Sequence, residues 1–393
     1  MNPAKRVLAI DVMRGLTLFL MLFVNDLYVP GVPDWLTHRP ADYDGMGLAD
    51  WVFPGFLFMV GMAVPFAIQS RLKKGDSKRQ ILLHILLRTI SLLIIGVLMM
   101  NTGRLNPGLS GVSQNLWAIG MYVSVFLIWN IYPEKWKYTS RVFKGLGVIG
   151  LVTLAIIFRS GTSEAPGWLI TGWWGILGLI GWGYLITSLV YLAVGDNLPA
   201  SALIWLGFVA LNALGMLGLT GFLNVLKPVF GVIIDGNVPS IVLAGLFFSL
   251  LLRKFKGNTR KFVILAGSLG LLVLVAGFVL RNWFIISKII GTPSWAMLCN
   301  GISISVFVIL YIIIDVWGRT KWATLFKMAG ENSLTTYLAP DILYHSIWLS
   351  GLPVLFYKHS EYSMIVISGS IVWALAMILF TRFLLKIGIR LKL

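Results

Sequence analysis

Apolar stretches of about 20 residues recur from one end of this chain to the other, separated by short polar segments. One such stretch crosses a bilayer as a helix, so the pattern predicts membrane-spanning helices throughout. Residues 1–393 are therefore expected to form a single all-α transmembrane domain, a polytopic bundle embedded in the lipid bilayer. About twelve spans are predicted, within a range of ten to twelve, at 7–29, 50–70, 81–100, 116–133, 144–159, 172–194, 199–220, 237–252, 261–281, 296–317, 331–350 and 363–387.

Lys and Arg residues fall mainly on alternate predicted loops. One set of loops, together with the two ends of the chain, carries 23 of the 32, whereas the opposite loops carry seven. Cytoplasmic loops are enriched in Lys and Arg, so both termini are predicted to be cytoplasmic. The formal net charge of +17 then reflects topology and contact with lipid headgroups, and no nucleic-acid partner is expected.

Composition narrows the class further. Hydrophobic residues make up 58% of the chain and charged residues 12%, as in a membrane protein. The single Cys299 excludes an internal disulfide and a cysteine metal cluster. The first apolar stretch lacks a small-residue cleavage site and is interrupted by an acid and a base, so it is interpreted as a retained span and not as a signal peptide.

Polar side chains gather in the first fifty positions, which hold six of the fifteen acidic residues. Asp11 and Arg14 lie inside the first predicted span, Asn25 near its far end, and Asp50 at the start of the second. A charged side chain in the bilayer costs about 2.5–3.5 kcal/mol on insertion scales, so its presence indicates function. We therefore look for the chemistry here.

His38 lies in the loop between these two spans. One helix runs out and the next runs back, so Asn25, His38 and Asp50 are expected to meet at the outer face of the membrane. A His beside a carboxylate is held in one tautomer and can act as a general base, and an Asn amide can stabilise an oxyanion. A solvated loop with an incidental His is the competing interpretation. A metal site formed with Asp34, Asp42 and Asp44 is less favoured.

Three further groups have both structural and functional interpretations. Asp11 and Arg14 share a helical face, either as a self-satisfied ion pair or as a site for an anionic ligand from the cytoplasm. Arg88, with His84 one turn earlier, either lines a polar interior or binds an anion. Asp341 and His345 lie four residues apart, where a local hydrogen bond is favoured over catalysis. The GLGVIG stretch at 145–150 opens a span and lacks the strand that a dinucleotide motif requires.

The opening of the chain resembles the heparan-α-glucosaminide N-acetyltransferase family, and most closely its bacterial branch. The shared pattern is D-x-x-R-G in the first span, an Asn at its outer end, a His in the loop and A-D-x-V-F-P-x-F-x-F-x-x-G in the second span. Weaker similarities surround Arg88, Gln114, TPSW at 292–295 and Asn332. The main pattern maps to Asp11, Arg14, Gly15, Asn25, His38 and Ala49–Gly61.

The resemblance implies a membrane-embedded acetyltransferase that takes acetyl-CoA from the cytoplasm and acetylates a sugar or glycan on the other side, which is periplasmic for a bacterial inner-membrane protein. His38 would be the catalytic base or a transient acetyl carrier, with Asn25 beside the acyl group and Asp50 orienting the imidazole. No metal is expected. The residues expected to hold the co-substrate are Arg14, Asp11, Arg88, Gln114 and Asn332.

Two departures from the family pattern change the expectations. Asn115 stands where the family often has Arg, which weakens an anion contact there, and residues 160–220 form apolar spans in place of a long polar loop. A different acceptor from heparan sulfate is therefore expected. A multi-pass transporter or flippase without covalent chemistry is the alternative function. A homodimer is a further expectation that no motif supports.

Overall fold

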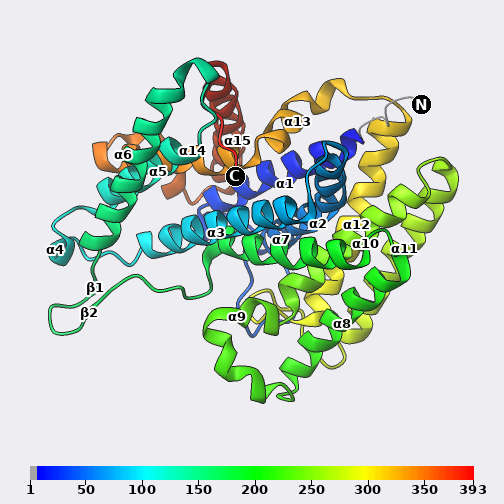
Figure 1. The fold of residues 1–393 in the computed structure, drawn as a ribbon. Helices are drawn as coiled ribbons and strands as arrows, with labels where there is room; N and C mark the ends of the chain where they lie inside the picture. The colour runs from blue at the N-terminus through cyan, green and yellow to red at the C-terminus, as the bar shows by residue number, and fades with distance from the viewer. Residues whose placement is uncertain (1–6) are drawn as a thin grey trace.

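The computed structural model describes residues 7–393, which form a bundle of helices with one short hairpin (Figure 1). The hairpin pairs β1 (Ser160–Gly161) with β2 (Pro166–Gly167) in antiparallel register. The α-helices are α1 Leu8–Asp26, α2 Leu48–Lys73, α3 Lys78–Thr102, α4 Pro107–Ser110, α5 Gln114–Trp129, α6 Lys137–Ile157, α7 Gly175–Val194, α8 Leu198–Met216, α9 Lys227–Ile234, α10 Asn237–Lys254, α11 Thr259–Leu280, α12 Pro293–Tyr311, α13 Thr324–Glu331, α14 Ser333–Ser350 and α15 Ser363–Lys386.

Ten helices of the described chain are long and apolar enough to cross a membrane. Every predicted span coincides with a helix, and the two helices outside the ten are α5, with 16 residues, and α14, which contains Pro340 and Asp341. The all-α polytopic architecture is thus confirmed, whereas the count of twelve spans and the side of the termini stay predictions. Lys5 and Arg6, which entered the charge argument, lie outside the described residues.

Glycines let the central helices approach backbone to backbone, as is typical of membrane bundles. A Cβ at Gly15 of α1 would lie 1.7 Å from the Phe326 carbonyl oxygen of α13, and one at Gly61 of α2 would lie 1.8 Å from the Val242 carbonyl oxygen of α10. Gly15 and Gly61 both belong to the motifs of the first two spans. These motif glycines therefore fix how α1 and α2 pack.

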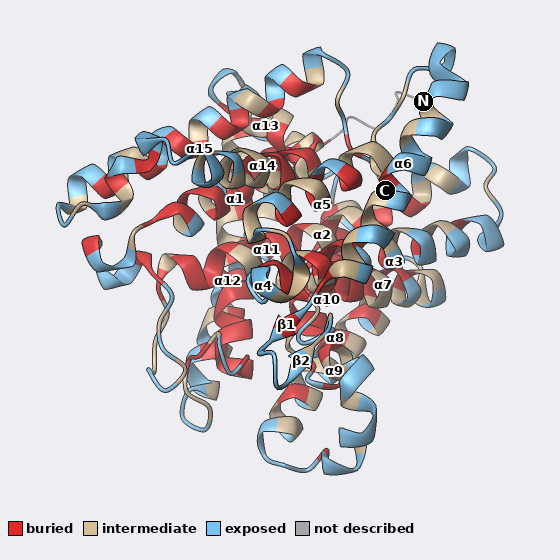
Figure 2. Cartoon of the chain, turned by 90° about the vertical axis from the view of Figure 1, so that its left-hand side faces the viewer, coloured by how far each residue is buried: buried red, intermediate tan, exposed pale blue. Residues whose placement is uncertain are grey.

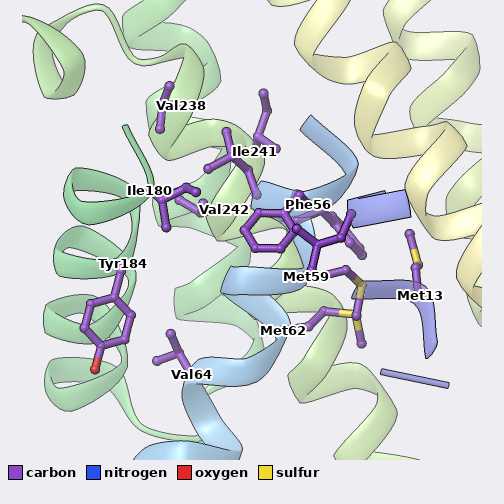
Figure 3. Close-up of a cluster of buried hydrophobic side chains, with 14 of the residues drawn as sticks. Met13, Phe56, Met59, Met62, Val64, Ile180, Tyr184, Val238, Ile241 and Val242 are labelled. Atoms are coloured by element: carbon purple, nitrogen blue, oxygen red, sulfur yellow. The ribbon is translucent and has the colours of Figure 1, made fainter. Parts of the chain in front are cut away.

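The packed core lies around α1, α2, α7, α10 and α12, and the outer helices are far more exposed (Figure 2). Figure 3 shows part of this core, where Met13 of α1, Phe56 of α2, Ile180 of α7 and Val242 of α10 converge. The exposed apolar side chains of α6 and α11 are the expected lipid-facing surface of a membrane bundle. The buried helices therefore form the scaffold on which a site can be fixed.

Both ends of α1 are held by side chains from distant segments. At its start, the two carboxylate oxygens of Asp315 each accept a backbone N–H, from Leu8 and Ala9, at 2.9 Å. At its end, the fully buried Asp26 accepts the hydroxyl of Tyr344, the hydroxyl of Tyr357 at 2.7 Å and the ammonium of Lys358 at 2.9 Å. A helix pinned at both ends gives its intervening polar residues fixed positions.

Candidate active site: two cavities along the first helix

The loop after α1 is closed by Asp50, the third residue of α2. One carboxylate oxygen of Asp50 accepts the backbone N–H groups of Gly47, at 3.0 Å, and Arg39, at 3.1 Å. Asp50 thereby caps the helix and folds the loop back over it. Only 1% of Asp50 is exposed, so its other oxygen is available to a single neighbour in a fixed direction.

That neighbour is His38. The Nδ1 atom of His38 lies 2.8 Å from the second oxygen of Asp50. An ionised carboxylate only accepts hydrogen bonds, so Nδ1 carries the proton and Nε2 is left as an acceptor. The His38 side chain is 46% exposed, which lets Nε2 meet a substrate while Nδ1 stays anchored. The predicted pairing of His38 with Asp50 is present.

Lys288 is a functional candidate that the sequence analysis missed. Its Nζ atom lies 3.1 Å from Nδ1 and 3.4 Å from Nε2 of His38, so the ammonium faces the ring and is not aligned with one nitrogen alone. Burial lowers the pKa of Lys288, and the negative charge of Asp50 opposes that shift. The available signal was a lone Lys four residues before the TPSW stretch.

The loops that carry His38 and Lys288 are joined to each other. Asp44 accepts the Arg281 guanidinium and the Ile286 backbone N–H, both at 2.8 Å, and Ser287 donates to the Ala41 carbonyl at 2.8 Å. These contacts hold the pKa of Asp44 below its ordinary value, and the hydrogen bond from Ile286 contributes more than the one from Arg281. These contacts of the acidic loop therefore hold the segment around His38 and the segment around Lys288 together.

The predicted loop carboxylates do not gather into a cluster of metal ligands. Asp44 is engaged as described, and Asp34 pairs with the guanidinium of Arg39 at 2.7 Å. Residues 7–393 contain no group of three or more His, Cys, Asp or Glu side chains placed to hold a metal ion.

The TPSW stretch, residues 292–295, contacts the start of α2. Thr292 caps α12, and the indole N–H of Trp295 donates to the backbone carbonyl of Asp50 at 3.2 Å. This motif therefore positions the start of α2, and with it Asp50, without entering the site.

A cavity of about 790 Å³ opens beside His38 at the C-terminal end of α1, the end that the charge pattern predicts to be outer. Its lining joins His38, Lys288 and Asn25, so the three side chains predicted or found here face one space. The far wall is formed by Trp173 and Trp174 before α7 and by residues of α9 and its surroundings. We call this space the outer cavity.

A second cavity of about 460 Å³ lies at the opposite end of α1, between α2, α3 and α7, and we call it the inner cavity. Its lining includes Asn332 and five basic side chains. These are Arg14, Arg71, Lys74, Arg88 and Lys392. Met21 and Ile176 line both cavities, so the two spaces adjoin at these residues.

Arg14 and Asp11 form the ion pair that their spacing predicted, at 2.9 Å, and Arg14 also donates to the Gly330 carbonyl at 2.7 Å. Asp11 is buried and does not line either cavity, so it orients Arg14. Arg88 lies over the ring of Tyr184, with its guanidinium carbon 4.6 Å from the ring centroid. Its buried Nε has no hydrogen-bond partner in the described chain, which suits a side chain that awaits an anion.

The remaining predicted residues lie apart from the cavities or form other contacts. Gln114 donates to the Thr102 carbonyl at 2.8 Å and lines neither cavity, so the structure does not bring it to the expected co-substrate site. The prediction of a local hydrogen bond between Asp341 and His345 is wrong. Asp341 interacts with Tyr122, whereas His345 meets the side-chain oxygen of Asn115 at 2.9 Å.

The geometry defines a class: a polytopic helical protein with a His–Asp pair at one end of its first helix and a basic cavity at the other. Residues 6–168 match a domain family described as a domain of unknown function, DUF5009. Two curated relatives are both named heparan-alpha-glucosaminide N-acetyltransferase. The mouse protein is 28% identical over 379 residues, and the human protein is 25% identical over 385 residues.

These matches cover 87% and 86% of the chain, so the predicted resemblance to the heparan-α-glucosaminide N-acetyltransferase family is confirmed along most of its length. They cover only 54% and 53% of the relatives, so the chain spans about half the length of the curated proteins it matches.

Proposed function

We propose that this chain is a transmembrane acetyltransferase that carries an acetyl group from acetyl-CoA on the cytoplasmic side to a sugar or glycan acceptor on the other side. The single observation that carries the proposal is the pair of adjoining cavities at opposite ends of α1. Neither a phosphorylated donor nor a bulky glycan can cross hydrocarbon, so a reaction between them needs a path through the protein. The names of the relatives support the same chemistry.

The inner cavity is the proposed donor site. Arg88 and Lys392 line it, and the described residues provide neither with an acidic partner within salt-bridge distance. Guanidinium and ammonium groups bind phosphate through charge-assisted hydrogen bonds. The thiol arm of the donor would then extend past Met21 and Ile176 towards His38. Along α1, Arg14 and Asn25 are about 16 Å apart at the helical rise of 1.5 Å per residue.

The outer cavity is the proposed reaction site. Nε2 of His38 takes a proton from the acceptor hydroxyl or amine as that group forms a bond to the acetyl carbonyl carbon. Asn25 and Lys288 face the same space and would stabilise the negative charge that develops on the carbonyl oxygen. The carbon–sulfur bond then breaks, and the proton on His38 passes to the leaving CoA thiolate. Asp50 holds the imidazole throughout.

The decisive measurement is CoA release by the purified protein in nanodiscs, with acetyl-CoA and a panel of amino sugars and neutral glycosides. Acceptor-dependent CoA release with an acetylated product would support the proposal. In the alternative route through acetyl-His38, about one equivalent of CoA per protein is released before any acceptor is added.

An outcome without acetylated product, in which a labelled sugar crosses the membrane of proteoliposomes unchanged, would overturn the proposal in favour of the transporter class. Reconstituted protein also tests sidedness, because acetyl-CoA should be consumed only from the face that exposes the inner cavity. Placement in a bacterial inner membrane and assembly as a homodimer belong to the same proposal and need separate measurements.

A further inference from the structure

The segment between α8 and α10 is an exposed apolar surface beside the outer cavity. Residues 217–230 include a 3₁₀ helix, Gly221–Leu226, and the first half of α9. Phe222 is 80% exposed and Val225 is 87% exposed. The segment projects at the bottom of Figure 1, below the α9 label, and its exposure is visible in the lower part of Figure 2.

This segment is not one of the long bundle helices, because it connects the ends of two of them. The Lys and Arg distribution assigns these ends to the outer side. A surface with this many apolar side chains is unfavourable in water and is typical of a segment that lies in the membrane interface. We therefore assign it to the outer leaflet, next to the bundle.

Helix α9 has two different faces. One is turned towards the outer cavity, which is lined by Lys227 and Gly231 of α9 and by Asp235 just after the helix. Val229 and Phe230 are exposed beside that face. One helix therefore separates the outer cavity from the surface that we assign to lipid.

The rim of the outer cavity is apolar as well. Ile289 is 62% exposed, and Ile290 and Trp173 are exposed too, yet all three belong to the cavity lining. Branched aliphatic side chains such as Ile289 and Ile290 offer a hydrated sugar neither hydrogen bonds nor an aromatic face to stack on. These side chains suit an apolar chain that passes from the leaflet towards the site.

We propose that the acceptor is a lipid-anchored molecule, with a sugar headgroup in the outer cavity and an apolar chain in the outer leaflet along α9 and Ile289. The inference rests on the proposed acetyltransferase function and narrows its substrate class. The headgroup meets Lys227, Asp235 and Asn237 on the far wall, where paired donors and acceptors suit sugar hydroxyls. Its reactive hydroxyl or amine then faces Nε2 of His38.

The test compares two acceptors with one headgroup, a methyl and a dodecyl glycoside, in nanodiscs of fixed lipid composition. The measured quantity is the ratio of KM for the methyl glycoside to KM for the dodecyl glycoside. Partition of the dodecyl chain into lipid contributes to this ratio in every variant, so the comparison between variants carries the test.

The rim variant Val229→Ser/Ile289→Ser should lower this ratio by at least about fivefold, because the chain loses its apolar path. The control variant Leu271→Ser/Leu272→Ser, on the exposed face of α11, should keep the wild-type ratio. CoA binding at the inner cavity reports the folding of each variant.

A wild-type ratio near one, or a rim variant that keeps the wild-type ratio, would overturn the lipid-anchored acceptor while leaving the acetyltransferase intact. Failure of every acceptor, soluble or anchored, to cause CoA release would instead overturn the proposed function itself.

Discussion

The two cavities differ in how their polar side chains are held. In the outer cavity, His38 is hydrogen-bonded to a buried carboxylate, and contacts of Asp44 and Ser287 join its loop to the loop of Lys288. In the inner cavity, basic side chains outnumber their acidic partners, and Arg88 has no carboxylate within salt-bridge distance in the described chain. Proton transfer needs a fixed geometry, whereas a flexible polyanion needs mainly charge. In the proposed function, the outer cavity therefore carries the chemistry and the inner cavity carries donor binding.

The largest effect is expected in the outer cavity, where His38 is held by Asp50. His38→Ala should lower acetyl transfer by about 10³-fold, since a positioned general base contributes about 10²–10⁴-fold. Binding of CoA, measured by calorimetry, should stay within about twofold of wild type. The matched control is His345→Ala, which removes a half-buried His that lines neither cavity and should retain transfer. Equal losses in the two variants would break the assignment of chemistry to the outer cavity.

Removal of the cation beside His38 should be nearly as severe. Lys288→Met should lower kcat by about 10²-fold, which is the cost of deleting one group that stabilises an oxyanion. Lys288→Arg keeps the charge and should recover part of the activity. Single-turnover rates separate this effect from acceptor binding. If methionine and arginine were equally harmful, the role of Lys288 would be shape and not charge.

The inner cavity should respond in the opposite way. Arg88→Met should raise KM for acetyl-CoA by about tenfold and change kcat by less than about twofold, because it removes binding common to ground state and transition state. Arg104→Met, two residues after the end of the same helix and outside both cavities, is the matched control and should leave KM unchanged. A loss confined to kcat would contradict a binding role for this cavity.

The smallest effect is expected for Asp44, whose contacts join the loop of His38 to the loop of Lys288. The pKa of Asp44 is lowered from its usual 3.8, so its ionised form adds stability that is fully present above pH 3.8 and is lost as the pH falls through the lowered value. Asp44→Asn should therefore lower the thermal midpoint at neutral pH by about 1–3 °C, and this difference should shrink in acid. Asp42→Asn, in the same loop, is the control. A difference independent of pH would remove the electrostatic explanation.

Local patterns predicted much of the site. Asn25 and Asp50 lie on two consecutive helices and His38 in the loop that joins them, so an outgoing and a returning helix bring the three near each other. Asp11 and Arg14 pair because residues three apart share a helical face. The same rule failed for Asp341 and His345, since their side chains found Tyr122 and Asn115 on a neighbouring helix. Spacing permits a contact but does not select it over partners from elsewhere.

The sequence by itself determined the class of fold, because a chain with recurrent apolar stretches can satisfy its backbone in a membrane only as helices. It also determined the first-loop constellation, whose members are close along the chain. Tertiary structure alone decided that Lys288 meets His38 across 250 residues, that Gln114 lies away from both cavities, and that α9 separates a cavity from an exposed apolar surface. These depend on helix packing over long separations, where close backbone approach and not local periodicity sets the neighbours.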